Sequence, residues 1–137
     1  MMTCRTSAAR ILLVEDDPLE RRRLEGVLAS LGHEVASVGD GDAAVARLIG
    51  ERFDAVLLDL VIPGLDGMGV IGALRRRGDD TPVVAAVTAA GLEGAASAMR
   101  AGASDFVVKP AGALRLKVAL DNAMALLAAR RATVSNV

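Results

Sequence analysis

The stretch Ile11-Leu12-Leu13-Val14-Glu15-Asp16-Asp17 passes from four aliphatic residues directly into three carboxylates. Three later segments repeat this design, because in each a short apolar run ends on a polar residue. These residues are Asp59 after 55–58, Thr88 after 83–87 and Lys109 after 106–108. Short apolar runs bounded by Gly, Asp or Pro are typical of strands buried on both faces of a parallel sheet. The four runs therefore predict strands of one such sheet.

Apolar runs alternate with segments of helical period along the chain, and this alternation predicts a parallel sheet with helices on both faces. We expect strands at 10–14, 34–38, 54–58, 82–87 and 105–108. The first helix is expected to begin at Asp17-Pro18-Leu19-Glu20, which resembles a capping box. The first four helices are expected to end at glycines in the left-handed conformation, namely Gly32, Gly50, Gly78 and Gly102. The last helix is expected over 112–130.

The polar strand ends are expected to meet, since the carboxyl ends of parallel strands lie on the sheet edge where such folds bind ligands. Glu15 and Asp16 are adjacent carboxylates, which repel each other unless a cation lies between them. Mg²⁺ suits this arrangement because it prefers octahedral oxygen ligands and retains several waters. Asp16 and Asp59 would bind it directly, Glu15 through water, and one loop carbonyl would add a further ligand. Asp17 is better placed to cap the following helix.

The other two strand ends carry groups that suit phosphoryl chemistry. Lys109 offers a mobile positive charge for Asp59 and then for a phosphoryl oxygen, while Thr88 offers a hydroxyl for another oxygen. Either residue alone would be an ordinary strand-end or surface residue. Together with a carboxylate nucleophile and a divalent cation, they are the groups needed to form an acyl phosphate on Asp59.

Length and composition limit the class of protein. A chain of 137 residues fits one domain, and its longest weakly polar stretch, 82–92, is about half of the roughly 20 residues that a membrane span needs. The segment 1–9 has no signal-peptide pattern, so we expect a disordered leader and a cytoplasmic location. Cys4 is the only cysteine, which excludes an internal disulfide.

The charge pattern gives no general attraction to nucleic acid. The net charge is −1, and the chain contains two Phe but no Tyr or Trp that could stack on bases. The basic runs Arg21-Arg22-Arg23 and Arg75-Arg76-Arg77 are therefore expected on solvated helix faces. Neither direct nucleic-acid binding nor membrane insertion is expected.

Other functions are weaker interpretations of these residues. The segment 67–72 spells G-x-G-x-x-G, but a dinucleotide site should directly follow the first strand, so close helix packing is the better interpretation. A phosphatase with an Asp nucleophile would need a second carboxylate, as acid and base for turnover, at the position of Val61. The single histidine, His33, is expected to be exposed rather than a phosphate carrier. No G-x-x-x-x-G-K-[ST] segment occurs, so a nucleotide hydrolase is not supported.

Over about 10–130, the chain resembles the receiver domain of response regulators in two-component signalling. The segments that carry the resemblance are Ile11 to Asp17, Leu57-Leu58-Asp59-Leu60, Pro63-Gly64-Leu65-Asp66-Gly67, Thr88-Ala89, Gly102-Ala103 and Asp105-Phe106-Val107-Val108-Lys109-Pro110. The receiver domain is expected to occupy 10–131 as a stand-alone domain, followed by a short tail at 132–137.

The resemblance implies an α/β, flavodoxin-like (βα)5 fold, a three-layer sandwich with five parallel strands in the order 2-1-3-4-5. It implies that Asp59 accepts a phosphoryl group from the phosphohistidine of a histidine kinase or a histidine phosphotransfer protein. Mg²⁺, with Mn²⁺ as a substitute, would be held by Glu15, Asp16, Asp59 and the backbone carbonyl of Val61. The bond between Lys109 and the following proline is expected to be cis. The protein would assist its own phosphorylation and dephosphorylation without being an enzyme in the ordinary sense.

The resemblance also implies a signalling switch. Thr88 and Lys109 would move towards the phosphoryl group, and Phe106, at the aromatic switch position of the family, would turn inward. The surface of the fourth helix, fifth strand and fifth helix would then change and regulate a downstream protein that the sequence does not identify. A plain core role for Phe106 is an equally good interpretation. The fourth helix, 93–101, has few charges and offers either an apolar partner surface or close packing, and dimerisation remains open.

Several residues depart from the family pattern. Val61 and Ala90 are apolar at positions that tune the lifetime of the phosphoryl group in the family, so we expect slow hydrolysis. Ala111 replaces the aromatic residue that commonly follows the Lys-Pro pair. Ser104 replaces the Asp of the commonest transcription-factor subgroup and weakens any inference to that subgroup's dimer. The alternative function is a receiver-like module that binds proteins independently of phosphorylation.

Overall fold

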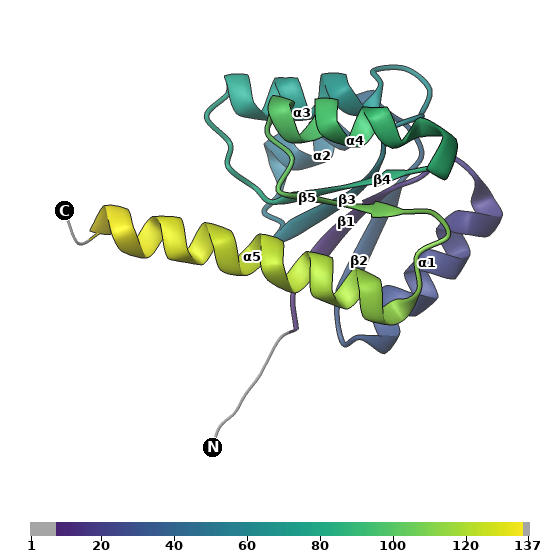
Figure 1. The fold of residues 1–137 in the computed structure, drawn as a ribbon, viewed down its shortest axis with the longest axis horizontal. Helices are drawn as coiled ribbons and strands as arrows, with labels where there is room; N and C mark the ends of the chain where they lie inside the picture. The colour runs from purple at the N-terminus through teal and green to yellow at the C-terminus, as the bar shows by residue number, and fades with distance from the viewer. Residues whose placement is uncertain (1–7, 136–137) are drawn as a thin grey trace.

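The computed structural model describes residues 8–135, where five strands alternate with helices (Figure 1). The strands are β1 (Arg10–Val14), β2 (Glu34–Val38), β3 (Ala55–Asp59), β4 (Val83–Val87) and β5 (Asp105–Val108). The helices are α1 (Pro18–Ser30), α2 (Gly41–Gly50), α3 (Gly67–Arg76), the 3-10 helix η1 (Ala89–Gly91), α4 (Leu92–Ala101) and α5 (Ala113–Ser135). Cys4 and most of the predicted leader lie outside the described residues.

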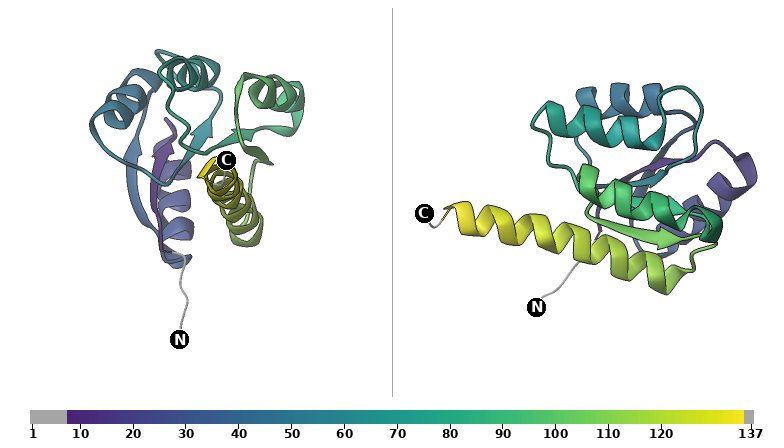
Figure 2. Two further views of the ribbon diagram at one scale, coloured as in Figure 1. Left: turned by 90° about the vertical axis from the view of Figure 1, so that its left-hand side faces the viewer. Right: turned by 45° about the horizontal axis from the view of Figure 1, so that its top comes forward.

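The strands form one parallel sheet in the order β2-β1-β3-β4-β5, which confirms the predicted fold. Helices α1 and α5 cover one face of the sheet, and α2, α3 and α4 cover the other, so the molecule has three layers (Figure 1, Figure 2). The chain runs from β1 outward to β2 and then returns to place β3 on the other side of β1. Ligand sites of open α/β sheets lie at the carboxyl ends of the strands beside such a reversal.

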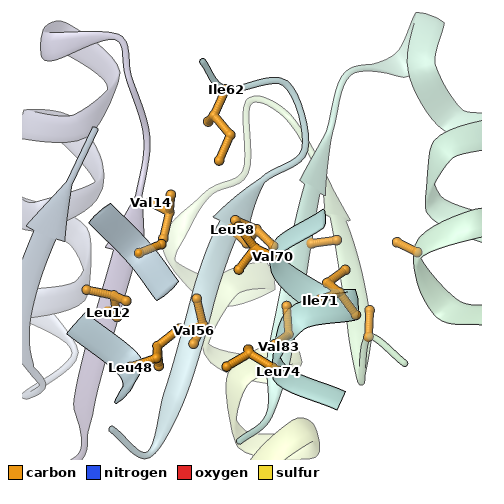
Figure 3. Close-up of a cluster of buried hydrophobic side chains, with 14 of the residues drawn as sticks. Leu12, Val14, Leu48, Val56, Leu58, Ile62, Val70, Ile71, Leu74 and Val83 are labelled. Atoms are coloured by element: carbon orange, nitrogen blue, oxygen red, sulfur yellow. The ribbon is translucent and has the colours of Figure 1, made fainter. Parts of the chain in front are cut away.

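Alternate residues of each strand pack on opposite faces of the sheet. In β1, Leu12 and Val14 join the cluster beneath α2, α3 and α4, part of which is drawn in Figure 3, whereas Ile11 and Leu13 join the cluster beneath α1 and α5. All five residues of β3 and of β4 are buried. Burial on both faces explains why these runs are continuously apolar. Each buried Val, Leu or Ile side chain contributes about 1.5–3 kcal/mol of burial free energy.

The glycines of the G-x-G-x-x-G segment lie in α3, where two of them allow close packing, as predicted. A Cβ on Gly67 would lie 2.6 Å from the Cα of Leu60, and a Cβ on Gly69 would lie 2.4 Å from Cδ1 of Leu65. The segment thus packs the start of α3 against the loop that follows β3, and no dinucleotide role is needed to explain it.

Three of the four predicted left-handed glycines are confirmed, namely Gly32, Gly78 and Gly102. The prediction for Gly50 is wrong, because α2 includes this residue and Glu51 continues in the extended conformation. Arg10 and Arg47 both bind the Glu51 carboxylate, and the chain passes into β3 without a left-handed turn. The fourth left-handed glycine is instead Gly64, in the loop after β3, with φ of 72°.

The start of α1 is only partly as predicted. Asp17 caps the helix by accepting from the N–H of Leu19 at 3.1 Å, and a proline occupies the first turn. The capping box is wrong, because Glu20 pairs with Arg23. The N–H of Asp17 donates instead to Oε2 of Glu15 at 3.2 Å, so the carboxylate of the preceding loop takes the place of the predicted partner.

Two polar side chains predicted to be exposed are enclosed by tertiary contacts. His33 is 7% exposed, and its Nδ1 accepts from the N–H of Ala9 at 3.1 Å. Arg75 is half-buried, and its guanidinium donates to three backbone carbonyl groups in the loops that follow α3 and α4. Arg21 is also half-buried rather than fully solvated. Neighbours that are distant in sequence create these environments.

Helix α5 extends to Ser135, beyond its predicted end at Arg130, so the first residues of the predicted tail are helical. Its core-facing residues are Leu116, Ala119, Leu120 and Ala123. The later turns project past the end of the sheet (Figure 1). Within residues 8–135, no helix combines the length and apolar character that crossing a membrane would require.

Close packing at the start of α2 predicts a stability difference between two glycines. A Cβ on Gly41 would lie 1.6 Å from the backbone oxygen of Leu65, whereas a Cβ on Gly26 in α1 meets no atom within 4 Å. Gly41→Ala should lower the free energy of unfolding by about 1–3 kcal/mol or more. Gly26→Ala should raise it by about 0.5–1 kcal/mol, because Ala favours a helix interior. Urea unfolding followed by circular dichroism measures both, and equal effects of the two changes would contradict the packing argument.

Candidate functional site

The predicted polar residues lie together at the carboxyl edge of the sheet. Glu15 and Asp16 follow β1, Asp59 ends β3, Thr88 follows β4 and Lys109 follows β5. All five line one pocket of about 430 Å³. Asp17 and six small or apolar residues complete its lining, the latter being Leu60, Val61, Ala86, Val87, Gly91 and Gly94. The pocket therefore combines an acidic cluster with a largely apolar remainder.

Three carboxylates form the acidic part of the site. One oxygen each from Glu15, Asp16 and Asp59 lies within 4.8 Å of the others. Glu15 and Asp59 are 2% and 7% exposed, whereas Asp16 is exposed. Hard cations take such oxygen ligands, and a cluster that is open on one side suits an ion that keeps part of its water shell.

Lys109 links the two buried carboxylates. Its Nζ lies 2.8 Å from Oδ2 of Asp59 and 3.3 Å from Oε1 of Glu15. Burial alone would lower the pKa of Lys109, but the contacts with Asp59 and then Glu15 outweigh it and raise this pKa. The lysine is thus held in its charged form. The peptide bond that follows it, to Pro110, is cis, as the resemblance implied.

The environment of Glu15 opposes its ionisation. Burial raises the pKa of its carboxyl group, and the charge of Asp59 adds to this effect. The N–H of Asp17 and the ammonium of Lys109 act in the opposite direction, but the net shift is upward. Any further positive charge beside the Glu15 carboxylate would stabilise its ionised form, and a bound cation would supply such a charge.

The loop after β3 is held from two sides. The N–H of Val61 donates to Oδ1 of Asp59 at 3.0 Å, and the Val61 side chain is 80% exposed. From the start of α2, Asp42 accepts from the N–H of Leu65 at 3.2 Å, and Gly41 donates to the carbonyl of Pro63 at 3.3 Å. Sequence reasoning missed this support from α2. The segment Asp40-Gly41-Asp42 is typical of a helix start, but this pattern does not indicate a contact with the loop after β3.

Thr88 and Phe106 have local structural partners. Oγ1 of Thr88 accepts from the N–H of Gly91 at 3.1 Å and so caps η1. Phe106 is half-buried and packs against the core cluster beneath α2, α3 and α4. Thr88 therefore faces the pocket with a hydroxyl that already accepts one hydrogen bond, while Phe106 is neither fully enclosed nor fully solvated.

Two arginines of α1 support the site and were missed by sequence reasoning. Nη1 of Arg21 donates to the backbone oxygen of Glu15 at 2.8 Å. Nη1 of Arg23 donates at 3.2 Å to the backbone oxygen of Ala111, in the connection between β5 and α5. The run of three arginines resembled a solvated helix face, and the chain carries no local pattern that marks which of them turns inward.

Comparison with known proteins agrees with this geometry. The family model for the response regulator receiver domain matches residues 11–121. Transcriptional regulatory protein TcrA of Mycobacterium tuberculosis is 40% identical over 106 residues, which are 77% of this chain and 42% of TcrA. The chain therefore spans less than half the length of this curated relative.

Two solved structures extend the comparison. NtrX from Brucella abortus superposes with a TM-score of 0.88 at 32% identity, covering 96% of this chain and 30% of NtrX. The receiver domain of the sensor histidine kinase PA1611 from Pseudomonas aeruginosa has a TM-score of 0.78 at 34% identity, covering 87% of this chain and 99% of that domain. That structure contains a magnesium ion coordinated in the active-site cleft.

The family match covers most of the chain, and the sheet order and the acidic edge agree with it. The chain belongs to the response regulator receiver domain family of two-component signalling.

Proposed function

We propose that Asp59 accepts a phosphoryl group from the phosphohistidine of a histidine kinase or a histidine phosphotransfer protein. The observation that carries this proposal is the convergence of Asp59, two further carboxylates and Lys109 at one sheet edge. In transfer, an Oδ atom of Asp59 forms a bond to phosphorus while the phosphorus–nitrogen bond of the donor breaks. The electron pair of the broken bond remains on the imidazole.

The groups around Asp59 prepare it for this step. Val61 N–H binds Oδ1 and Lys109 Nζ binds Oδ2, so the orientation of the carboxylate is fixed before a donor arrives. After transfer, Lys109 can follow the negative charge to a phosphoryl oxygen, because its ammonium is held by ionic contacts on a flexible stem. The protein thus assists the transfer with positioned charges and supplies the accepting atom itself.

The site fits Mg²⁺, with Mn²⁺ as a chemically similar substitute. Glu15, Asp16 and Asp59 would hold the ion together with the backbone carbonyl of Val61, and the carboxylate oxygens already lie within 4.8 Å of one another. A bound ion would offset the charge of the phosphoryl oxygens and of the crowded carboxylates. The magnesium ion in the PA1611 receiver domain supports this assignment by analogy.

Phosphorylation would change the surface formed by α4, β5 and α5. The phosphoryl group adds about 1.5 to 2 negative charges, towards which Thr88 is drawn. Its movement would release Oγ1 from the Gly91 N–H at the start of α4. Only Ala95 and Ala98 of α4 are buried, and no side chain caps the helix, so α4 can shift at low cost. Phe106 would fill the space behind Thr88, and a downstream protein would read the new surface.

Removal of the accepting carboxylate tests the proposal. Asp59→Asn should abolish Mg²⁺-dependent labelling by acetyl phosphate, because the amide is a poor nucleophile for phosphorus and a weaker ligand for the ion. The matched control is Asp121→Asn, which removes an exposed carboxylate of α5 that pairs with Lys117. Mass spectrometry measures the added phosphoryl group. Undiminished labelling of Asp59→Asn would refute the assignment, and an unlabelled wild-type chain would favour the phosphorylation-independent module.

The lifetime of the phosphoryl group gives a second test. Val61 is 80% exposed and Ala90 is exposed, and neither apolar side chain can hold an attacking water by a hydrogen bond. The phosphorylated chain should therefore persist for minutes or longer, and Val61→Asn should shorten this lifetime. Leu114→Asn, at a similarly exposed position in α5, should leave it unchanged. Phosphate release after removal of the donor measures the rate, and decay of the wild type within seconds would contradict the expectation.

A further inference from the structure

Arg21 is a cation beside the acidic cluster that pairs with none of its carboxylates. It lies in the second turn of α1, and its Nη1 donates to the backbone oxygen of Glu15 at 2.8 Å. Among residues 8–135, its guanidinium forms no ion pair, whereas Lys109 pairs with both Glu15 and Asp59. The role of Arg21 therefore differs from that of Lys109, because it acts on the backbone of the loop between β1 and α1.

This backbone contact matters because the Asp16 side chain has no partner of its own. Of the hydrogen bonds and ion pairs within residues 8–135, none includes the Asp16 carboxylate. The peptide groups on either side of Asp16 do have side-chain partners. Arg21 binds the carbonyl of the preceding peptide group, and Oε2 of Glu15 accepts from the N–H of the following one, at Asp17.

The Arg21 guanidinium also lies close to the residue that follows β2. A Cβ on Gly39, in the connection between β2 and α2, would lie 3.3 Å from Nη1 of Arg21. The Glu15 N–H donates to the carbonyl of Val38 at 3.1 Å, so Glu15 is tied through both of its backbone polar groups. The half-buried guanidinium of Arg21 thus lies between the loop that follows β1 and Gly39, which follows β2.

We infer that Arg21 is a positioning residue for the Mg²⁺ site, because its hydrogen bond to Glu15 fixes the direction of the Asp16 carboxylate. This inference rests on the proposed function, since it takes Asp16 as a ligand of the ion. Partners that orient metal ligands typically change metal affinity by about 10- to 100-fold when they are removed.

A purely electrostatic role and a positioning role of Arg21 predict opposite changes in Mg²⁺ affinity when Arg21 is replaced. If Arg21 acted only through its positive charge, its removal would strengthen the binding of a cation nearby. If it positions Asp16, its removal weakens binding although the site becomes more negative. Arg21→Met removes the charge and the donor while keeping an unbranched side chain. Arg22→Met is the matched control, because Arg22 is the exposed neighbour in the same turn of α1.

The experiment is calorimetric titration of the wild type and the variants with magnesium chloride alone, at a temperature where circular dichroism shows all of them folded. Arg21→Met should bind Mg²⁺ about 10-fold more weakly or worse. Arg22→Met should bind it as tightly as the wild type or slightly more tightly. Arg21→Lys, which keeps a donor on a long stem, should recover most of the affinity.

A second variant tests the same contact from the opposite side. Gly39→Val should displace the guanidinium while leaving Arg21 in the chain, and it should also weaken Mg²⁺ binding. This variant decides the matter if Arg21→Met does not fold. Unchanged or tighter binding by Arg21→Met, with a wild type that does bind Mg²⁺, overturns the positioning role alone. Failure of the wild type to bind Mg²⁺ overturns both this inference and the metal site of the proposed function.

Discussion

The ion pair between Lys109 and the carboxylates of Asp59 and Glu15 is the interaction on which the site depends. A buried carboxylate without a partner costs several kcal/mol, and the sheet edge buries two of them side by side. The single ammonium of Lys109 cannot neutralise three carboxylates, so an excess of negative charge remains. Part of this charge lies on Asp16, which is exposed to solvent. The fold thus holds a charge imbalance that a divalent cation would correct.

The strands that carry the acidic site are packed more firmly than α4, and this difference suits a switch. The carboxylates follow β1 and end β3, two neighbouring inner strands whose side chains are largely buried on both faces. By contrast, α4 contributes only two buried alanines and begins without a side-chain cap. Under the proposed function, a change in charge at the pocket would therefore act on firmly packed carboxylates and on a more loosely packed α4. In the proposed switch, the signal would leave the site through α4, the less firmly packed element.

Sequence predicted the parts of the structure that depend on local periodicity and on topology. The strand runs gave the sheet, and parallel strands necessarily bring Glu15, Asp59 and Lys109 to one edge. Features that depend on distant neighbours were missed or wrong. Arg21, Arg22 and Arg23 are identical residues in succession, yet one binds a backbone carbonyl beneath the site, one is solvated and one pairs within the helix. A helix turns each residue to a different side, and its environment depends on what the rest of the chain places there.

The partners of Thr88 bear on the proposed switch. The N–H of Gly91 is shared between Oγ1 of Thr88 at 3.1 Å and its backbone oxygen at 3.0 Å. Release of the hydroxyl therefore leaves that N–H with a partner, and the loss is below the about 1 kcal/mol of an ordinary hydrogen bond. A hydrogen bond to a charged phosphoryl oxygen contributes about 1.5–3 kcal/mol. Under the proposed function, the hydroxyl would thus stay on the Gly91 N–H in the absence of phosphate and move to the phosphoryl group in its presence. The shared N–H would keep the cost of this release low.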